Sequence, residues 1–129
     1  MTTHTMTIQV HRTNLLTANQ RLHWATRARM TRVLREKGSM SARAFGLPVM
    51  SSAVVNVYVT YPDRRARDVA NLHPTAKAVI DGVVSDAKRL PNDTDEHLKG
   101  PFLWHDEGRT TRYPGLYVFR FEFEEVEAA

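Results

Sequence analysis

The sequence contains no cysteine and no long hydrophobic run. Without cysteine, this chain of 129 residues has no disulfide framework, no cysteine-bound zinc site and no thiol nucleophile. No run of apolar residues approaches the ~18 needed to span a membrane. The N-terminal residues lack the charged and apolar regions of a secretory signal. These absences predict a protein of the cytoplasm with no membrane partner.

Acidic residues are scarce in the first half of the chain. Residues 1–67 carry 11 basic and 2 acidic side chains, whereas residues 68–129 carry 7 basic and 12 acidic ones, for a total charge of +4. Hydrophobic residues make up 42% and charged residues 25%, which is typical of a globular chain. The length predicts a single domain over residues 1–129 whose basic half suits a polyanionic partner.

The hydrophobic pattern predicts an α+β fold, a small mixed β-sheet with helices packed on one face. β-Branched and aromatic residues, or their alternation with polar ones, indicate strands at residues 6–10, 52–61, 97–104 and 116–124. Helices are expected at residues 19–37 and 74–88. Gly38 is a plausible end for the first of them, with a short helical turn at 39–45. The polar residues 105–115 are expected to form a turn region and a mobile loop.

The loop after the second strand is the first candidate site. Asp68 follows Arg64, Arg65 and Arg67 there. A carboxylate at the end of a strand suits Mg²⁺, which prefers oxygen ligands, and the arginines suit phosphates. The alternative is a solvated charged loop.

A second candidate lies after the helix at 74–88, where Asn92, Asp93, Asp95 and Glu96 cluster. Close carboxylates repel one another unless a cation lies between them, although the same residues also form ordinary turns. The helix would separate Asp68 from Asp93 by about 20 Å at ~1.5 Å per residue. They would meet only if the chain runs back along the helix or a second subunit supplies one of them.

Lys77 and the basic helix are further candidates. Lys77 could neutralise a phosphate or a leaving oxygen, or simply pair with Asp81 at the i, i+4 spacing. Residues 19–37 carry six basic side chains, among them Arg21, Arg27 and Arg29, against the single acid Glu36. Such a helix suits the backbone of nucleic acid, with a solvated helix or a membrane surface as alternatives. Trp24 is expected in the core, or stacked on a base.

The segment YPDRRARDVANLHPTAKAVIDGVVSDAKRLPNDTDEH, residues 61–97, resembles the RusA family of Holliday junction resolvases, which is common in phages and prophages. The shared features are a strand ending in P-D-R-R, an R-D-x-D-N-type motif, a helix with an early Lys and a later Asp, and a following D-D pair. A first strand and a polar turn at residues 19–21 ahead of a basic helix are similar too. The likeness extends loosely over residues 6–125.

The resemblance implies a homodimer that binds DNA four-way junctions or other branched DNA and cuts them with Mg²⁺, in a bacterial or phage-infected cell. It implies that Asp68 and Asp93 bind the metal, that both act with Lys77 in catalysis, and that Asp81 matches the helix aspartate. Arg64, Arg65, Arg67, Arg21, Arg27 and Arg29 would bind nucleic acid.

The sequence departs from the family pattern at three places. Ala70 stands where the second Asp of D-x-D-N is expected, Asn92 replaces the first Asp of the D-D pair, and three extra residues lie between Asn71 and Lys77. An alternative function is therefore a catalytically weakened or inactive module that binds DNA junctions. A small basic scaffold that meets an acidic partner is a third possibility.

Overall fold

The computed structural model describes residues 2–126, which form one four-stranded sheet and two main helices. In chain order the elements are β1 (Thr2–His11), α1 (Trp24–Ala44), β2 (Ala53–Tyr61), α2 (His73–Asp81), β3 (Leu98–Thr110) and β4 (Leu116–Glu125). The short segments are the 3₁₀ turns η1 (Arg12–Asn14) and η2 (Val69–Leu72), and η3 (Gly82–Asp86), which continues α2 as a π-helix.

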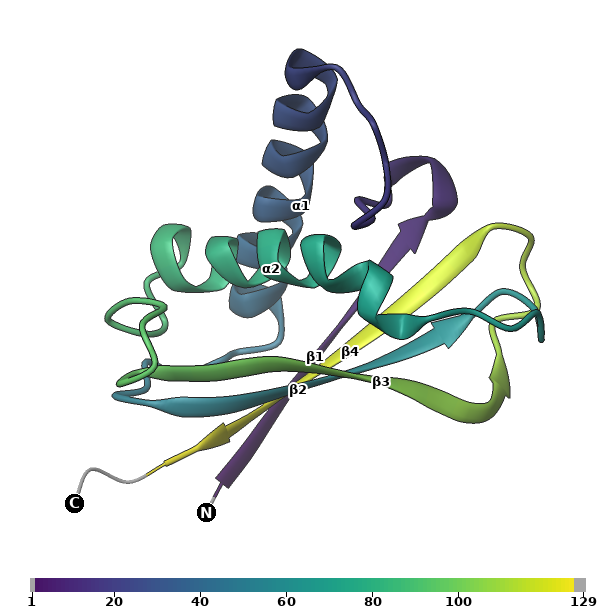
Figure 1. Ribbon diagram of the computed structural model, residues 1–129. Coiled ribbons are helices and arrows are strands. Elements are labelled where there is room, and N and C mark those ends of the chain that lie inside the picture. The colour runs from purple at the N-terminus through teal and green to yellow at the C-terminus, as the bar shows by residue number, and fades with distance from the viewer. Residues whose placement is uncertain (1, 127–129) are drawn as a thin grey trace.

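The sheet is mixed, with strand order β1-β4-β2-β3. β4 pairs antiparallel with both β1 and β2, whereas β3 runs parallel to β2. A parallel neighbour needs a crossover connection, and α2 with the loop after it provides that connection. Both helices lie on one face of the sheet, where α2 runs across it and α1 rises away from it (Figure 1). The predicted α+β architecture is confirmed.

Alternating residues of the two central strands build the core. Every second residue of β2 is buried, and the same holds for the aromatic side of β4: Ala53, Val55, Val57, Val59, Tyr61, Tyr117, Phe119, Phe121 and Phe123. From the helix side, Ala76, Val79, Ile80 and Val83 are fully buried against them. The strand at 116–124 and the apolar stripe of the helix at 74–88 therefore have the roles that their periodicity predicts.

Two glycines allow α1 and α2 to cross at backbone contact. A Cβ built on Gly38 would lie 2.0 Å from the carbonyl oxygen of Val79, and one on Gly82 would lie 2.0 Å from that of Arg35. The expected helix end at Gly38 is wrong, because α1 continues through it to Ala44. Glycine weakens a helix locally, but here the missing side chains let the two helices pack.

Three other expectations are corrected. α1 begins at Trp24, where the His23 ring accepts a hydrogen bond from Ala25 N and caps the helix, rather than at residue 19. β3 passes through Gly100 and Pro101 and extends to Thr110, so most of the expected turn region at 105–115 is strand. Trp24 is not in the core, since 77% of it is exposed. Within residues 2–126, none of the helices has the length and apolar character of a membrane span.

Candidate functional site

Lys77 forms the centre of a three-residue cluster on the outer side of α2. Its Nζ donates to Asp81 Oδ1 at 2.5 Å and to Asp93 Oδ2 at 2.7 Å. The side chains of Lys77, Asp81 and Asp93 are 39%, 30% and 48% exposed, so the cluster is open to solvent. One ammonium group therefore holds two carboxylates that belong to different elements.

The end of η3 explains how Asp93 reaches α2. Lys88 has a positive φ of 56°, and the amide of Arg89 donates to the carbonyl of Val83 at 3.1 Å. A left-handed residue with this bond reverses the chain at the end of a helix. The loop that follows returns beside α2 and brings Asp93 to Lys77. It does not bring Asp93 to Asp68, because the two carboxylates line different hollows.

The ion pair shifts both titrations. Burial lowers the pKa of Lys77, but the hydrogen bonds to Asp81 and Asp93 outweigh it and leave that pKa raised. The hydrogen bond and charge of Lys77 lower the pKa of Asp93. The stabilisation from Asp93 is therefore present above its ordinary pKa and is lost as the pH falls through the lowered value. That from Lys77 is lost as the pH rises through the raised one, so both groups are charged at neutral pH.

Asp68 lies in a different hollow, of about 360 Å³, which we call the Asp68 hollow. Its carboxylate accepts a hydrogen bond from Ala70 N at 3.0 Å and caps η2. The residues that line the hollow come from three parts of the chain: Leu15, Thr17, Asn19, Ala66, Arg67, Asp68, Asn71, Leu72 and Tyr117. Asp93 instead lines another hollow, with Val49, Val84, Ser85, Lys88, Leu90, Pro91 and Asn92.

The segment after β1 is fastened to α2 by a buried threonine. Thr75 is fully buried, and its hydroxyl donates to Leu16 O at 2.7 Å and accepts from Leu16 N at 2.8 Å. The amide of Ala18 also donates to Asn71 O at 3.0 Å. Thr75 belongs to the stretch LHPTA that departs from the family spacing, and it helps to bring Asn19 to the Asp68 hollow.

The sequence pattern alone does not place Thr17, Asn19 or Tyr117 near Asp68. For Asn19, the polar turn at residues 19–21 is a signal, because this turn is part of the RusA resemblance. Tyr117 has no comparable signal, since its pattern predicts only an inward residue of an alternating strand. Its hydroxyl accepts a hydrogen bond from Arg67 Nε at 3.1 Å.

The arginines of the loop after β2 differ in their ion pairing and in their exposure to solvent. Arg67 turns inward, with its Nη1 2.7 Å from Asp63 Oδ1 and its guanidinium 5.0 Å from the centre of the Tyr61 ring. Arg65 pairs more loosely with Asp63 at 3.3 Å and is 83% exposed. Arg64 is exposed and lines a hollow beside His105. Arg64 and Arg65 are therefore more accessible to a phosphate than Arg67.

Oxygen donors at Asp68 are of the kind that Mg²⁺ prefers. The Asp68 carboxylate shares its hollow with the side chains of Thr17, Asn19 and Asn71, and Mg²⁺ typically keeps several waters besides one or two carboxylates. Among residues 2–126, no three His, Asp or Glu side chains come close enough to hold one metal ion. The donor chemistry thus fits Mg²⁺ at Asp68, while Asp93 has the ammonium of Lys77 as its cationic neighbour.

Two of the three departures from the RusA pattern, Ala70 and Asn92, have local consequences. Ala70 contributes only its backbone amide to Asp68. Asn92 is engaged in its own loop, where its Oδ1 accepts hydrogen bonds from Thr94 N at 3.0 Å and from Thr94 Oγ1 at 2.6 Å. Neither position supplies a free carboxylate.

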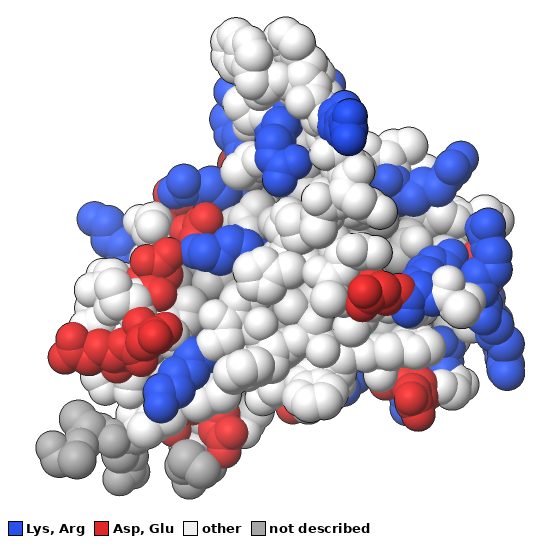
Figure 2. All heavy atoms as spheres, in the orientation of Figure 1, with Lys and Arg blue, Asp and Glu red and all other residues white. Residues whose placement is uncertain are grey.

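Charges of the two signs are unevenly distributed on the visible surface, although each end of the molecule carries some side chains of both signs (Figure 2). Lys and Arg side chains follow the rising helix α1 and gather at the end of the sheet near the loop after β2. Asp and Glu side chains gather at the opposite end, below the C-terminal end of α2. On this face, α1 is therefore mainly basic, whereas the end below α2 carries both signs.

Comparison with known proteins adds no relative to this picture. Neither a protein-family model nor a curated protein matches the sequence.

Proposed function

We propose that the chain is a RusA-like, magnesium-dependent, structure-specific endodeoxyribonuclease that resolves Holliday junctions in DNA recombination and repair. The observation that carries the proposal is the contact of Lys77 with both Asp81 and Asp93. The three residues occupy the lysine and aspartate positions of the resemblance, and they are far enough apart in sequence that local pairing alone would not join Asp93 to the other two. The basic surface of α1 and the β2 loop supports DNA as the substrate.

In this proposal each group has a role that phosphodiester hydrolysis needs. Asp68 and Asp93 bind Mg²⁺, which supplies charge stabilisation and an activated water when bound. Lys77 offsets the negative charge that develops on the phosphate oxygens. The exposed arginines, Arg64 and Arg65 with Arg21, Arg27 and Arg29, bind backbone phosphates, a contribution that does not depend on base sequence.

A homodimer forms part of the proposal. Asp68 and Asp93 line different hollows of one chain, so a second subunit that supplies one carboxylate to the other's site would bring them together. Two sites related by symmetry also match a junction in which two strands must be cut. Sedimentation at several protein concentrations, with and without junction DNA, measures this association.

Asp93→Asn tests the active-site assignment. The variant keeps the size of the side chain but removes a carboxylate that binds cations, so we expect junction cleavage with Mg²⁺ to slow by about tenfold or more, in the range seen when support for a metal is lost. The assay uses a synthetic four-way junction with labelled strands, and Asp95→Asn serves as the matched control in the same loop. Equal cutting by wild type and Asp93→Asn would contradict the assignment.

The alternative function is a DNA-junction-binding module with weakened or absent catalysis. It is favoured because the two candidate carboxylates already have protein partners: Asp68 caps η2 and Asp93 pairs with Lys77. Ala70 and Asn92 supply no carboxylate. This alternative predicts junction binding in EDTA and no cleavage with Mg²⁺ or Mn²⁺. If a single missing ligand is the cause, Ala70→Asp should produce measurable cutting. Efficient junction cleavage by the wild type with Mg²⁺ would contradict this alternative function.

A further inference from the structure

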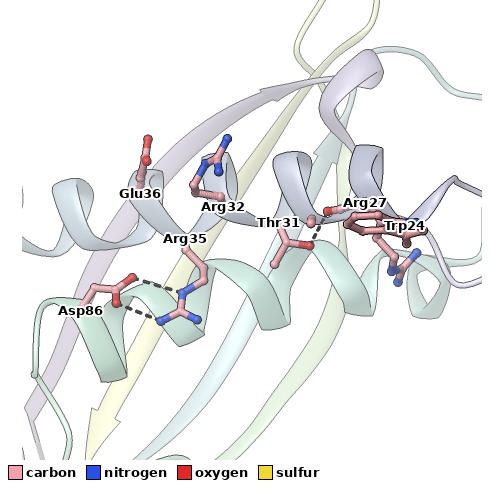
Figure 3. Close-up of a pocket in the computed structure, with 8 residues that line it drawn as sticks. Trp24, Arg27, Thr31, Arg32, Arg35, Glu36 and Asp86 are labelled. Atoms are coloured by element: carbon pink, nitrogen blue, oxygen red, sulfur yellow. Dashed lines mark hydrogen bonds and ion pairs between the residues drawn. The ribbon is translucent and has the colours of Figure 1, made fainter.

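A groove beside α1 contains a combination of groups that the proposed catalysis does not use. This hollow of about 710 Å³, which we call the α1 groove, runs along the helix from Trp24 and Arg27 past Arg32. The pair of Arg35 and Asp86, with hydrogen bonds of 2.9 and 3.2 Å, closes its other end (Figure 3). The indole of Trp24 lies at the open end, next to Arg27.

The part of α1 that carries Trp24 contacts the core only lightly, through the half-buried Met30. No residue between positions 24 and 33 is buried, and Leu34 is the first buried residue of the helix. Trp24 is 77% exposed, with its ring 5.5 Å from that of the capping residue His23. A large aromatic side chain at the tip of a projecting helix leaves a flat stacking surface in solvent, because nothing in the described chain covers it.

The charges around the indole define the chemistry of its partner. In the described part of the chain, Arg35 is the only basic residue of α1 that forms an ion pair with a carboxylate. Arg27 and Arg32 line the groove without one, and Glu36 is the sole acid of α1. A flat aromatic ring beside the unpaired Arg27, with the unpaired Arg32 farther along the groove, matches a strand whose phosphates are anionic and whose base is unstacked. An acidic peptide supplies the charge but no ring.

We infer that Trp24 stacks on an unpaired base of single-stranded or branched DNA, while Arg27 and Arg32 bind the adjacent phosphates. This inference rests on the proposed DNA function and deepens it, since it assigns the preference for open DNA structures to one side chain. A continuous duplex keeps its bases stacked and offers Trp24 no free face. The α1 groove therefore distinguishes a branch point from ordinary duplex.

Tryptophan fluorescence gives a direct test because the chain contains two tryptophans. The second, Trp104 on β3, is 52% exposed, donates to Asn56 Oδ1 at 2.9 Å and does not line the α1 groove. In a Trp104→Phe background, emission reports Trp24 alone. We expect oligo(dT) and a junction with an unpaired centre to quench this emission saturably, and a blunt duplex of equal length to quench it far less.

Affinity measurements with variants complete the test. Trp24→Ala is expected to weaken binding to oligo(dT) and open junctions by about 5- to 100-fold, the range for one stacked base, and to change duplex binding less than twofold. Arg27→Ala should instead weaken all DNA forms alike and reduce the salt dependence by about one ion. Trp104→Ala is the matched control and should leave affinity unchanged. Thermal unfolding confirms that each variant is folded.

The outcomes separate this inference from the proposed function. If Trp24→Ala binds open DNA as wild type does and no quenching occurs, the stacking role is overturned although DNA binding stands. If the wild type binds no DNA at low salt, both are overturned. Saturable quenching by polyglutamate but not by oligo(dT) would assign the α1 groove to an acidic peptide and would also overturn the inference.

Discussion

Gly38→Ala and Gly82→Ala are each expected to destabilise the protein, although alanine is the better helix former. The new Cβ atoms would lie 2.0 Å from the carbonyl oxygens of Val79 and Arg35, far inside the ~3.5–4.0 Å of a normal contact. Overpacking of a well-packed site typically costs about 1–3 kcal/mol or more, against a propensity gain of about 1 kcal/mol. We expect a net loss of about 2 kcal/mol, with the crossing helices forced apart.

Urea and thermal unfolding measure this loss. For a domain of this size, about 2 kcal/mol corresponds to a fall in Tm of roughly 8 °C. Gly46→Ala is the control, because Gly46 has a positive φ of 67° but no atom within 4 Å of the position that an added Cβ would occupy. It should lose about 1 kcal/mol through backbone strain alone. A gain in stability for Gly38→Ala, as propensity alone predicts, would contradict the close crossing.

The double variant adds a second check on the crossing. Once one alanine has pushed the helices apart, the other meets less crowding, so the two losses should sum to more than the loss in the double variant. Strict additivity would indicate that each glycine acts within its own helix. In that case, the absence of side chains at the two glycines would not be what allows α1 and α2 to pack closely.

Elements defined by local pattern could be predicted well. The alternation of aromatic residues from Tyr117 to Phe123 places one face of β4 in the core, and the β-branched run before Tyr61 marks β2 as a buried strand. The stripe containing Val79 and Val83 places one side of the second helix against the sheet. In each case burial follows directly from the spacing of the side chains along one element.

Features that depend on a second element could not be predicted. Gly38 suggests a helix end because helix propensity depends only on the local sequence. The backbone of Val79, which lies against Gly38 and favours a glycine there, comes from another helix. Trp24 is expected in the core because size and hydrophobicity favour burial, yet the helix end that carries it extends past the sheet. β3 continues into the polar residues after Trp104 because Tyr61 and neighbouring β2 residues provide its hydrogen-bonding partners.

The candidate site shows the same division. The i, i+4 spacing predicts the pair of Lys77 and Asp81, and the structure contains it. The contact of Lys77 with Asp93 depends on the chain reversal at Lys88, which no helical periodicity reveals. The position of Asn19 beside Asp68 likewise depends on a long-range hydrogen bond, between Thr75 and Leu16.

Lys77→Met is expected to reduce junction cleavage by about 100- to 1,000-fold, the effect of removing one group that stabilises transition-state charge. Methionine keeps much of the length and flexibility of the side chain but carries no charge. The Lys77 side chain is 39% exposed, so water weakens its ion pairs with Asp81 and Asp93. Loss of these pairs should lower the free energy of unfolding by only about 0–1 kcal/mol. Cleavage and stability should therefore respond very differently.

Single-turnover cleavage with Mg²⁺, together with unfolding at several pH values, distinguishes catalysis from a purely structural pair. Lys77 lowers the pKa of Asp93, so wild type loses stability in acid as this carboxylate is protonated. This loss of stability should be smaller in Lys77→Met. Asp81→Asn is the control, because it breaks the local pair but keeps the contact with Asp93. If Lys77→Met cuts at the wild-type rate and changes only the acid dependence of stability, the lysine is a structural link between α2 and the following loop.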